Sequence, residues 1–169
     1  MGAEAQKVDA RRYLLVPRTL IFVTRADAVL LLQGAPDKRL WAGKYNGVGG
    51  HVQRGEDVLT AARRELWEET GLEADLWLCG VVTIDAQPER GVVLFVFRGE
   101  ARDPNMPLRP SREGAARWVP LTGWRQLPLV EDLPRLLPRV LACSRGEPLF
   151  FAQYRYGGDG RLEITFVDG

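Results

Sequence analysis

The chain contains few of the residues on which several protein classes depend. Among its 169 residues there are only two cysteines and one histidine. A lone histidine, His51, does not make a metal site, and two cysteines are too few for the disulfide framework of a small secreted domain. Cys79 and Cys143 stand in apolar stretches, so we expect buried free thiols in a reducing compartment, with the cytoplasm as the default.

An excess of either charge and a long apolar run are also missing. Lysine and arginine number 23 against 22 acidic residues, a formal net charge of +1, which gives no indication of a nucleic-acid polymer or an anionic membrane as partner. The longest clear apolar run, Val92 to Phe97, is far shorter than the roughly 20 residues that span a bilayer. Residues 1–12 lack the apolar stretch of a signal peptide, so we expect a flexible N-terminal tail followed by one domain over residues 13–169.

Alternating strand and helix patterns predict an α/β fold. Helices are expected over Asp57 to Thr70 and from about Asp132 to Ala142. Pro138 falls inside the second helix and should kink or shorten it, because proline cannot donate the helical hydrogen bond. Strands are expected over Leu14 to Val23, Ala28 to Gln33, Ala74 to Ile84, Val92 to Arg98, Arg117 to Pro120, Phe150 to Tyr156 and Arg161 to Val167.

The most informative segment is residues 50–72, which carries an acidic cluster. Glu65, Glu68 and Glu69 stand at positions i, i+3 and i+4 of the first expected helix. At about 100° of rotation per residue, they share one arc of roughly 100°. Three carboxylates on one face repel each other unless a cation lies between them. A hard divalent ion, Mg²⁺ first, is the economical interpretation.

The other residues of this expected helix supply an apolar face and a signal at each end. Leu59, Ala62 and Leu66 share a second face that would pack onto a sheet. Asp57 is a suitable N-cap and Gly71 a suitable C-terminal stop. The glycine-rich stretch 47–50 in front of the helix allows the backbone to pass close to a ligand.

Together these residues resemble a known motif. Gly50, Glu56, Arg64-Glu65-Leu66, Glu68-Glu69 and Gly71-Leu72 stand at the spacing of a complete Nudix box. An ordinary amphipathic helix with a solvated acidic face accounts for Glu68 and Glu69 alone. It does not account for the glycine loop or for Glu56 and Arg64 at fixed distances. The chain is similar to a Nudix hydrolase, and the resemblance implies the Nudix fold, an α/β/α sandwich with a mixed β-sheet.

The resemblance also implies a chemistry. Nudix enzymes use water and divalent metals to cleave a nucleoside diphosphate linked to another group. Arg64 would pair with one of the acids, and Glu65 would either bind metal or take the proton from the attacking water. Mg²⁺, with Mn²⁺ as an alternative, would be held by Glu56, Glu68, Glu69 and the carbonyl of Gly50 or Gly49. Glu113 corresponds to a glutamate that joins the metal site in some related enzymes, and a bare loop glutamate is the competing interpretation.

The surrounding segments resemble the MutT-like branch that destroys oxidised purine triphosphates. Asn46 would read the base, although a turn asparagine before glycine is nearly as good an explanation. Glu131 and Asp132 fall where that branch has an acidic pair on the base edge, without the tryptophan that precedes it there. Acids are also favoured at a helix N-terminus, which is the alternative for both. Lys44 is a candidate phosphate contact, and Gly49 is a candidate substrate-binding residue.

We therefore expect a Mg²⁺-dependent Nudix pyrophosphohydrolase. The favoured substrate is a purine nucleoside triphosphate such as 8-oxo-dGTP, cut to the monophosphate and pyrophosphate. An ADP-ribose or nucleoside diphosphate sugar pyrophosphatase is the alternative among enzymes. A nucleotide-sensing module without catalysis is a third hypothesis, although such modules usually have a damaged acid set. For the oligomeric state, the sequence leaves both a monomer and a homodimer as alternatives.

Overall fold

The computed structural model describes residues 2–9 and 11–168. One eight-stranded sheet and two helices form most of it. Helix α1 is Val58–Thr70 and helix α2 is Leu133–Ala142, with short 3-10 turns at Ala3–Gln6 and Trp124–Gln126. The strands are β1 Leu14–Arg25, β2 Ala28–Gly34, β3 Tyr45–Asn46, β4 Ala74–Ile84, β5 Arg90–Ala101, β6 Gly114–Pro120, β7 Phe150–Tyr156 and β8 Leu162–Asp168.

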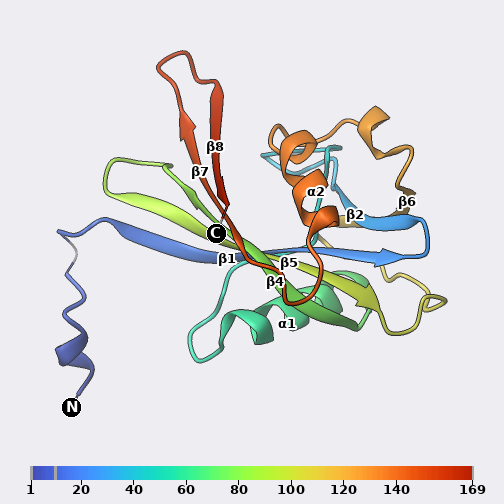
Figure 1. Ribbon diagram of the computed structural model, residues 1–169, viewed down its shortest axis with the longest axis horizontal. Helices are drawn as coiled ribbons and strands as arrows, with labels where there is room; N and C mark the ends of the chain where they lie inside the picture. The colour runs from blue at the N-terminus through green and yellow to red at the C-terminus, as the bar shows by residue number, and fades with distance from the viewer. Residues whose placement is uncertain (1, 10, 169) are drawn as a thin grey trace.

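The sheet is mixed, as the sequence predicts. Its strand order is β3-β2-β1-β5-β4-β7-β8, and β6 also pairs with β2. The β1–β5 and β4–β7 pairs are parallel, whereas the other pairs are antiparallel. Figure 1 shows α1 on one face of the sheet and α2 on the other, with the β7–β8 hairpin projecting from it. The predicted α/β/α layering is therefore confirmed.

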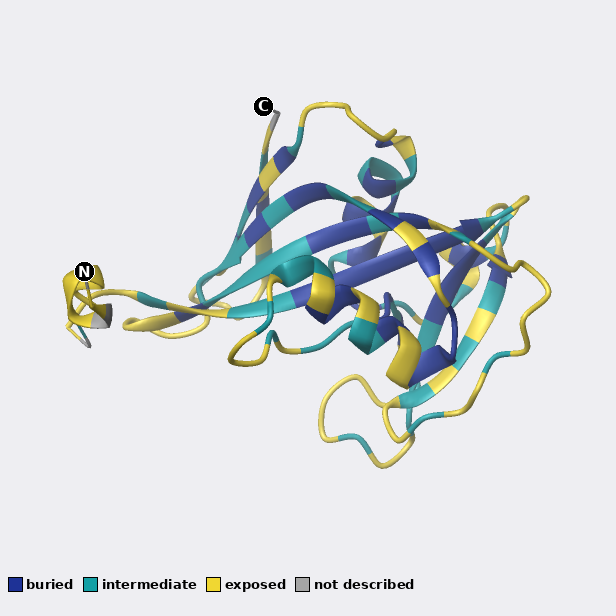
Figure 2. Ribbon diagram, turned by 90° about the horizontal axis from the view of Figure 1, so that it is seen from below, coloured by how far each residue is buried: buried dark blue, intermediate teal, exposed yellow. Residues whose placement is uncertain are grey.

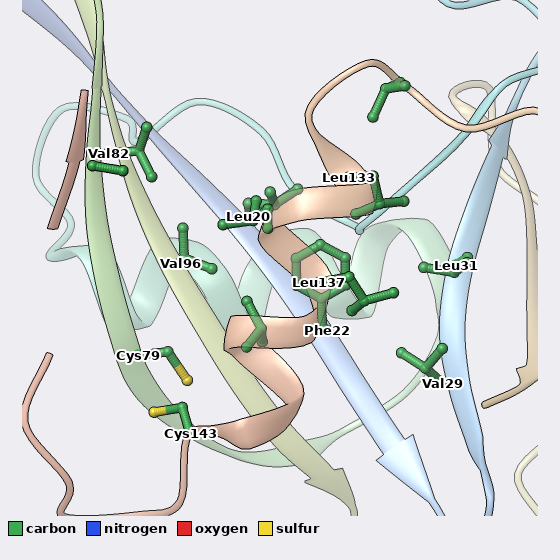
Figure 3. Close-up of a cluster of buried hydrophobic side chains, with 14 of the residues drawn as sticks. Leu20, Phe22, Val29, Leu31, Cys79, Val82, Val96, Leu133, Leu137 and Cys143 are labelled. Carbon is green, nitrogen blue, oxygen red and sulfur yellow. The ribbon is translucent and has the colours of Figure 1, made fainter. Parts of the chain in front are cut away.

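Alternating side chains of the central strand divide the core into two clusters. Leu20 and Phe22 of β1 point to the cluster that contains α2, whereas Ile21 and Val23 point to the cluster that contains α1. This follows from the two-residue period of a strand that is covered on both faces. Figure 3 shows the first cluster, in which Leu133 and Leu137 of α2 lie over β1. Cys79 and Cys143 lie beside each other at its end, and both are buried free thiols.

Helix α1 follows its predicted pattern closely. The Asp57 side chain accepts hydrogen bonds from the backbone N–H groups of Leu59 and Thr60, both at 2.9 Å, so it is the N-cap. Gly71 ends the helix in the left-handed conformation at φ 75°. Ala62 and Leu66 are fully buried against the sheet, and the opposite face of the helix is exposed (Figure 2). The acids are thereby held at a fixed angle to the sheet.

The second helix ends where the sequence predicts, so of the two expected effects of Pro138 the shortening is not observed. Pro138 does not end α2, which continues to Ala142. The bond that proline cannot donate would have reached the carbonyl of Pro134 in the first turn, so only one bond near the helix start is lost. Leu133, Leu136, Leu137 and Val140 are buried and hold the helix on the sheet. Neither described helix is long and apolar enough to cross a membrane.

Candidate active site

The glycine loop before α1 lies directly against strand β1. Val48 exchanges two backbone hydrogen bonds with Ile21, at 2.7 and 3.1 Å, and the Gly50 carbonyl accepts from the Thr19 amide at 2.9 Å. A Cβ on Gly49 would come within 2.0 Å of the Thr19 carbonyl oxygen, so only glycine fits. The Gly50 carbonyl keeps one lone pair for a further partner. The loop therefore brings bare backbone up to the start of the acidic helix.

Arg64 is the centre of a charged network. Its guanidinium donates to both oxygens of Glu56, at 2.7 and 3.0 Å, and to the His51 carbonyl at 3.0 Å. The Glu56 carboxylate also accepts from the Gln53 amide at 2.7 Å. The paired guanidinium is the main cause that lowers the pKa of Glu56. Glu56, predicted as a metal ligand, thus lies in a bidentate pair that fixes Arg64 to the loop.

The remaining guanidinium nitrogen of Arg64 binds two of the helix acids. Its Nη1 atom donates to Glu65 at 2.8 Å and to Glu68 at 3.0 Å. The Glu65 carboxylate also lies against the loop, since a Cβ on Gly50 would come within 2.4 Å of its Oε1 atom. The absence of a side chain at Gly50 therefore makes the space that Glu65 occupies.

Glu69 is the acid that the chain leaves least satisfied. Its side chain is on the buried side of α1, with 4% of the residue exposed, and its Oε2 atom has no hydrogen-bond partner. Burial, followed by the charge of Glu65, raises the pKa of Glu69 to about 7. A buried carboxylate oxygen without a partner is costly, and a divalent cation would remove that cost. The donor set therefore fits a hard metal ion.

Glu113 stands just before β6, and its carboxylate pairs with Lys38 from the loop between β2 and β3. Glu65, Glu68, Glu69 and Glu113 all line the same cleft. Within residues 2–9 and 11–168, no three His, Cys, Asp or Glu side chains are already close enough together to hold an ion. Arg64 and Lys38 draw the carboxylates to themselves, so side-chain movement would accompany metal binding.

Another part of the cleft lining is assembled from segments that are distant in the sequence. The Tyr45 amide donates to the Pro128 carbonyl at 2.8 Å, and the Val130 amide donates to the Tyr45 carbonyl at 3.1 Å. These bonds attach the start of α2 to β3 and bring Asn46 to the same cleft as Glu131 and Asp132. The three residues predicted to recognise a base therefore meet in one place.

Each of the three residues has a distinct environment. The Asn46 side-chain oxygen accepts from the Gly47 amide at 2.8 Å, as expected of a turn asparagine, and its nitrogen has no acceptor among the described residues. Asp132 is the N-cap residue of α2, but its side chain makes no capping bond. Burial is the main cause that raises the pKa of Asp132. Glu131 is exposed and accepts from the Leu162 amide at 3.4 Å.

The cleft has a volume of about 930 Å³. It brings together every predicted site residue except Glu56 and Arg64, which lie behind Glu65 and Glu68: the lining includes Lys44, Asn46, Gly49, Gly50, Glu65, Glu68, Glu69, Glu113, Glu131 and Asp132. Sequence reasoning missed Arg18, Thr19, Lys38 and Tyr154, which also line it. Arg18 and Thr19 reach the cleft only because β1 pairs with the glycine loop, a contact that no local pattern reveals.

Known proteins resemble this chain in sequence and in fold. The sequence profile of the NUDIX domain matches residues 14–140. An oxidized purine nucleoside triphosphate hydrolase of Danio rerio is 43% identical over 82 residues, which cover 48% of this chain and 45% of that protein. An NAD-capped RNA hydrolase of Stutzerimonas stutzeri is 28% identical over 135 residues, 79% of this chain and 47% of that protein. The chain thus matches less than half the length of each of these relatives.

Solved structures agree with the fold. A MutT protein from Bacillus halodurans superimposes with a TM-score of 0.74 at 25% identity, covering 90% of this chain and 97% of that one. The match extends beyond residue 140, so the similarity includes part of the C-terminal segment in addition to the box. Its box, its fold and its profile match together show that this chain is a member of the Nudix family.

Proposed function

We propose that the protein is a Mg²⁺-dependent pyrophosphohydrolase of oxidised purine nucleoside triphosphates, with 8-oxo-dGTP as the first candidate. The products would be the nucleoside monophosphate and pyrophosphate. One observation carries the proposal: a single cleft is lined both by acids of the Nudix box and by Asn46 and Asp132. We call the part that the box acids line the phosphate end and the part that Asn46 and Asp132 line the base end. The distant similarity to an oxidized purine nucleoside triphosphate hydrolase supports the same substrate class.

The phosphate end supplies the reaction chemistry in this proposal. Glu65, Glu68, Glu69 and Glu113, with the second lone pair of the Gly50 carbonyl, would hold the divalent ions. When bound, such ions neutralise the charge of the polyphosphate and favour ionisation of water. Glu65 has two open roles, as a ligand or as the acceptor of the water proton. Because Arg64 donates to Glu65, it would keep that carboxylate oriented in either role.

Glu56 has a supporting role in this proposal. Each of its oxygens accepts a hydrogen bond from Arg64, so it would hold the arginine in place. Loss of Glu56 would release Arg64 and, through it, Glu65. We therefore place Glu56 beside the metal site as a positioning residue.

The base end would distinguish the substrate. The unpaired side-chain nitrogen of Asn46 can donate to a purine acceptor. Burial raises the pKa of Asp132, and its carboxyl group offers a second hydrogen-bonding partner to a base in the same cleft. A site that hydrogen-bonds a substrate group rejects an analogue that lacks it, because its own polar groups are then left unpaired. An oxidised purine differs from the normal purine in the hydrogen-bond donors and acceptors that its ring presents.

The test is a substrate panel of 8-oxo-dGTP, dGTP, ATP, NAD and ADP-ribose, each with Mg²⁺. Release of pyrophosphate and a monophosphate, with the highest kcat/KM for the oxidised nucleotide, is the expected result. Asp132→Asn should reduce the preference for 8-oxo-dGTP by about tenfold, since a buried hydrogen bond contributes on the order of 1–2 kcal/mol. Equal kcat/KM for 8-oxo-dGTP and dGTP in the unaltered protein would contradict the substrate assignment.

A dinucleotide or ADP-ribose substrate is the second candidate. It is favoured by the similarity to an NAD-capped RNA hydrolase, which extends over 79% of this chain. Higher kcat/KM for NAD or ADP-ribose in the same panel would select it. A nucleotide sensor without turnover is disfavoured because Glu56, Glu65, Glu68 and Glu69 are all present. The cytoplasm is the proposed compartment, on the expectation that Cys79 and Cys143 act as reduced thiols.

A further inference from the structure

Lys38 lies on the loop between β2 and β3, at the phosphate end of the cleft. Its ammonium group pairs with the Glu113 carboxylate. The Ala35 amide donates to the Glu113 carbonyl at 3.1 Å, so the two loops are also attached through their backbones. The positive charge of Lys38 acts to lower the pKa of Glu69, which places it near the helix acids as well. Lys38 is therefore a positively charged side chain that lies among the acidic side chains of the site.

Two of the cations, Arg64 and Lys38, pair with acids of the site, and they differ in how firmly they are held. Arg64 donates to Glu56, Glu65, Glu68 and the His51 carbonyl, and only 21% of its side chain is exposed. Lys38 has a single carboxylate partner among the described residues, and 34% of its side chain is exposed, against 50% for that of Glu113. A half-exposed ion pair contributes little to stability. Of these two cations, Lys38 is the one that can separate from its carboxylate partner.

We propose that Lys38 exchanges partners during the catalytic cycle, pairing with Glu113 before metal binds and with a substrate phosphate afterwards. The inference rests on the proposed metal site. A divalent ion that recruits Glu113 displaces the lysine from it, and the freed ammonium group lies in the cleft where the polyphosphate arrives. A lysine ammonium is a compact point charge on a flexible stem, which suits such a change of partner. Metal binding thereby prepares a phosphate contact.

The exchange predicts effects of opposite sign on two ligands. In Lys38→Met the competitor for Glu113 is gone, so Mn²⁺ should bind the nucleotide-free protein about two- to fivefold more tightly. The same variant loses a charged phosphate contact, so the manganese complex of inorganic triphosphate should bind about tenfold or more weakly. If Lys38 only kept the loop in place, its loss would weaken binding of both ligands or of neither.

Electron paramagnetic resonance of free Mn²⁺ gives the first affinity, and calorimetric titration with the preformed manganese–triphosphate complex gives the second. Arg39→Met is the matched control, because Arg39 follows on the same loop, is exposed and is outside the described residues that line the cleft. It should change neither affinity. Lys38→Arg keeps the charge and should recover most of the triphosphate affinity.

The outcomes separate this inference from the proposed function. If the unaltered protein binds Mn²⁺ and cleaves nucleotides while Lys38→Met matches it in both affinities, only the lysine exchange is wrong. Weaker Mn²⁺ binding by Lys38→Met would also overturn the exchange, since it would make Lys38 a support for the site. If the unaltered protein does not bind Mn²⁺, both the proposed metal site and the proposed lysine exchange are wrong.

Discussion

The two ends of the cleft are constructed in different ways. At the phosphate end, one helix and the loop before it supply Glu65, Glu68, Glu69 and Gly50, and Arg64 ties helix and loop together. At the base end, Asn46 comes from β3 and Asp132 from the start of α2, 86 positions further along the chain by their numbering. Two backbone hydrogen bonds through Tyr45 attach these segments to each other.

This difference separates what is fixed from what can vary. Moving one box acid by a single position would rotate it about 100° away from the others. The base end would tolerate change more easily, because its residues belong to separate segments of the chain and can be replaced one at a time. Under the proposed function, the reaction would depend mainly on local helix geometry, whereas the choice of nucleotide would depend on long-range packing.

The largest expected effect comes from breaking the phosphate end. Glu69→Gln should lower turnover by about 10²–10⁴-fold, because loss of an ion's charge stabilisation is worth several kcal/mol. Pyrophosphate release with saturating Mg²⁺ measures it, and circular dichroism checks the fold. Glu73→Gln, on an exposed glutamate just after α1, is the control and should leave turnover unchanged. Undiminished turnover in Glu69→Gln would remove Glu69 from the metal site.

The same substitution should have the opposite effect on stability without metal. The pKa of Glu69 is raised from 4.5 to about 7 in the folded protein, so the folded state binds this proton more tightly than the unfolded state does. Stability is therefore highest below pH 4.5 with respect to this group and falls as the pH rises to about 7, by about 3 kcal/mol. In EDTA at pH 8, Glu69→Gln should recover much of this loss.

Urea unfolding in EDTA at pH 5 and pH 8 measures the effect. The unaltered protein should lose stability between these two values relative to Glu69→Gln, and Mg²⁺ should stabilise the unaltered protein alone at pH 8. A difference in unfolding free energy that does not depend on pH would show that the burial of Glu69 is not the cause.

Asn46 tests the base end, where a smaller effect is expected. Asn46→Ala should reduce the ratio of kcat/KM for 8-oxo-dGTP to that for dGTP by about tenfold, because one buried hydrogen bond is worth about 1–2 kcal/mol. Turnover at saturating substrate should change less, since the phosphate end is intact. If both nucleotides lose rate equally, Asn46 supports the loop through its bond to Gly47 and does not read the base.

The same contrast explains how much the sequence could predict. The cap at Asp57, the stop at Gly71 and the acidic arc of α1 depend on neighbours within a few positions, and all three are observed. Glu56 shows what sequence spacing cannot predict. The spacing predicts that Glu56 lies near the site, but its bidentate pair with Arg64 depends on how the loop folds back. Thr19 and Lys38 could not be found at all, because β-sheet register and loop path bring them to the cleft.

Glu131 should show the smallest effect and sharpens the division within the acidic pair. It is exposed and its Oε1 atom accepts from the Leu162 amide, a bond that glutamine can also accept. Glu131→Gln should therefore change the preference for 8-oxo-dGTP by no more than about threefold, since exposed charges contribute on the order of 0.2–1 kcal/mol. Side-by-side kcat/KM ratios for Glu131→Gln and Asp132→Asn measure it. A loss as large as that of Asp132→Asn would place Glu131 on the base edge, as the MutT-like resemblance implies, and the two acids would then act as a pair.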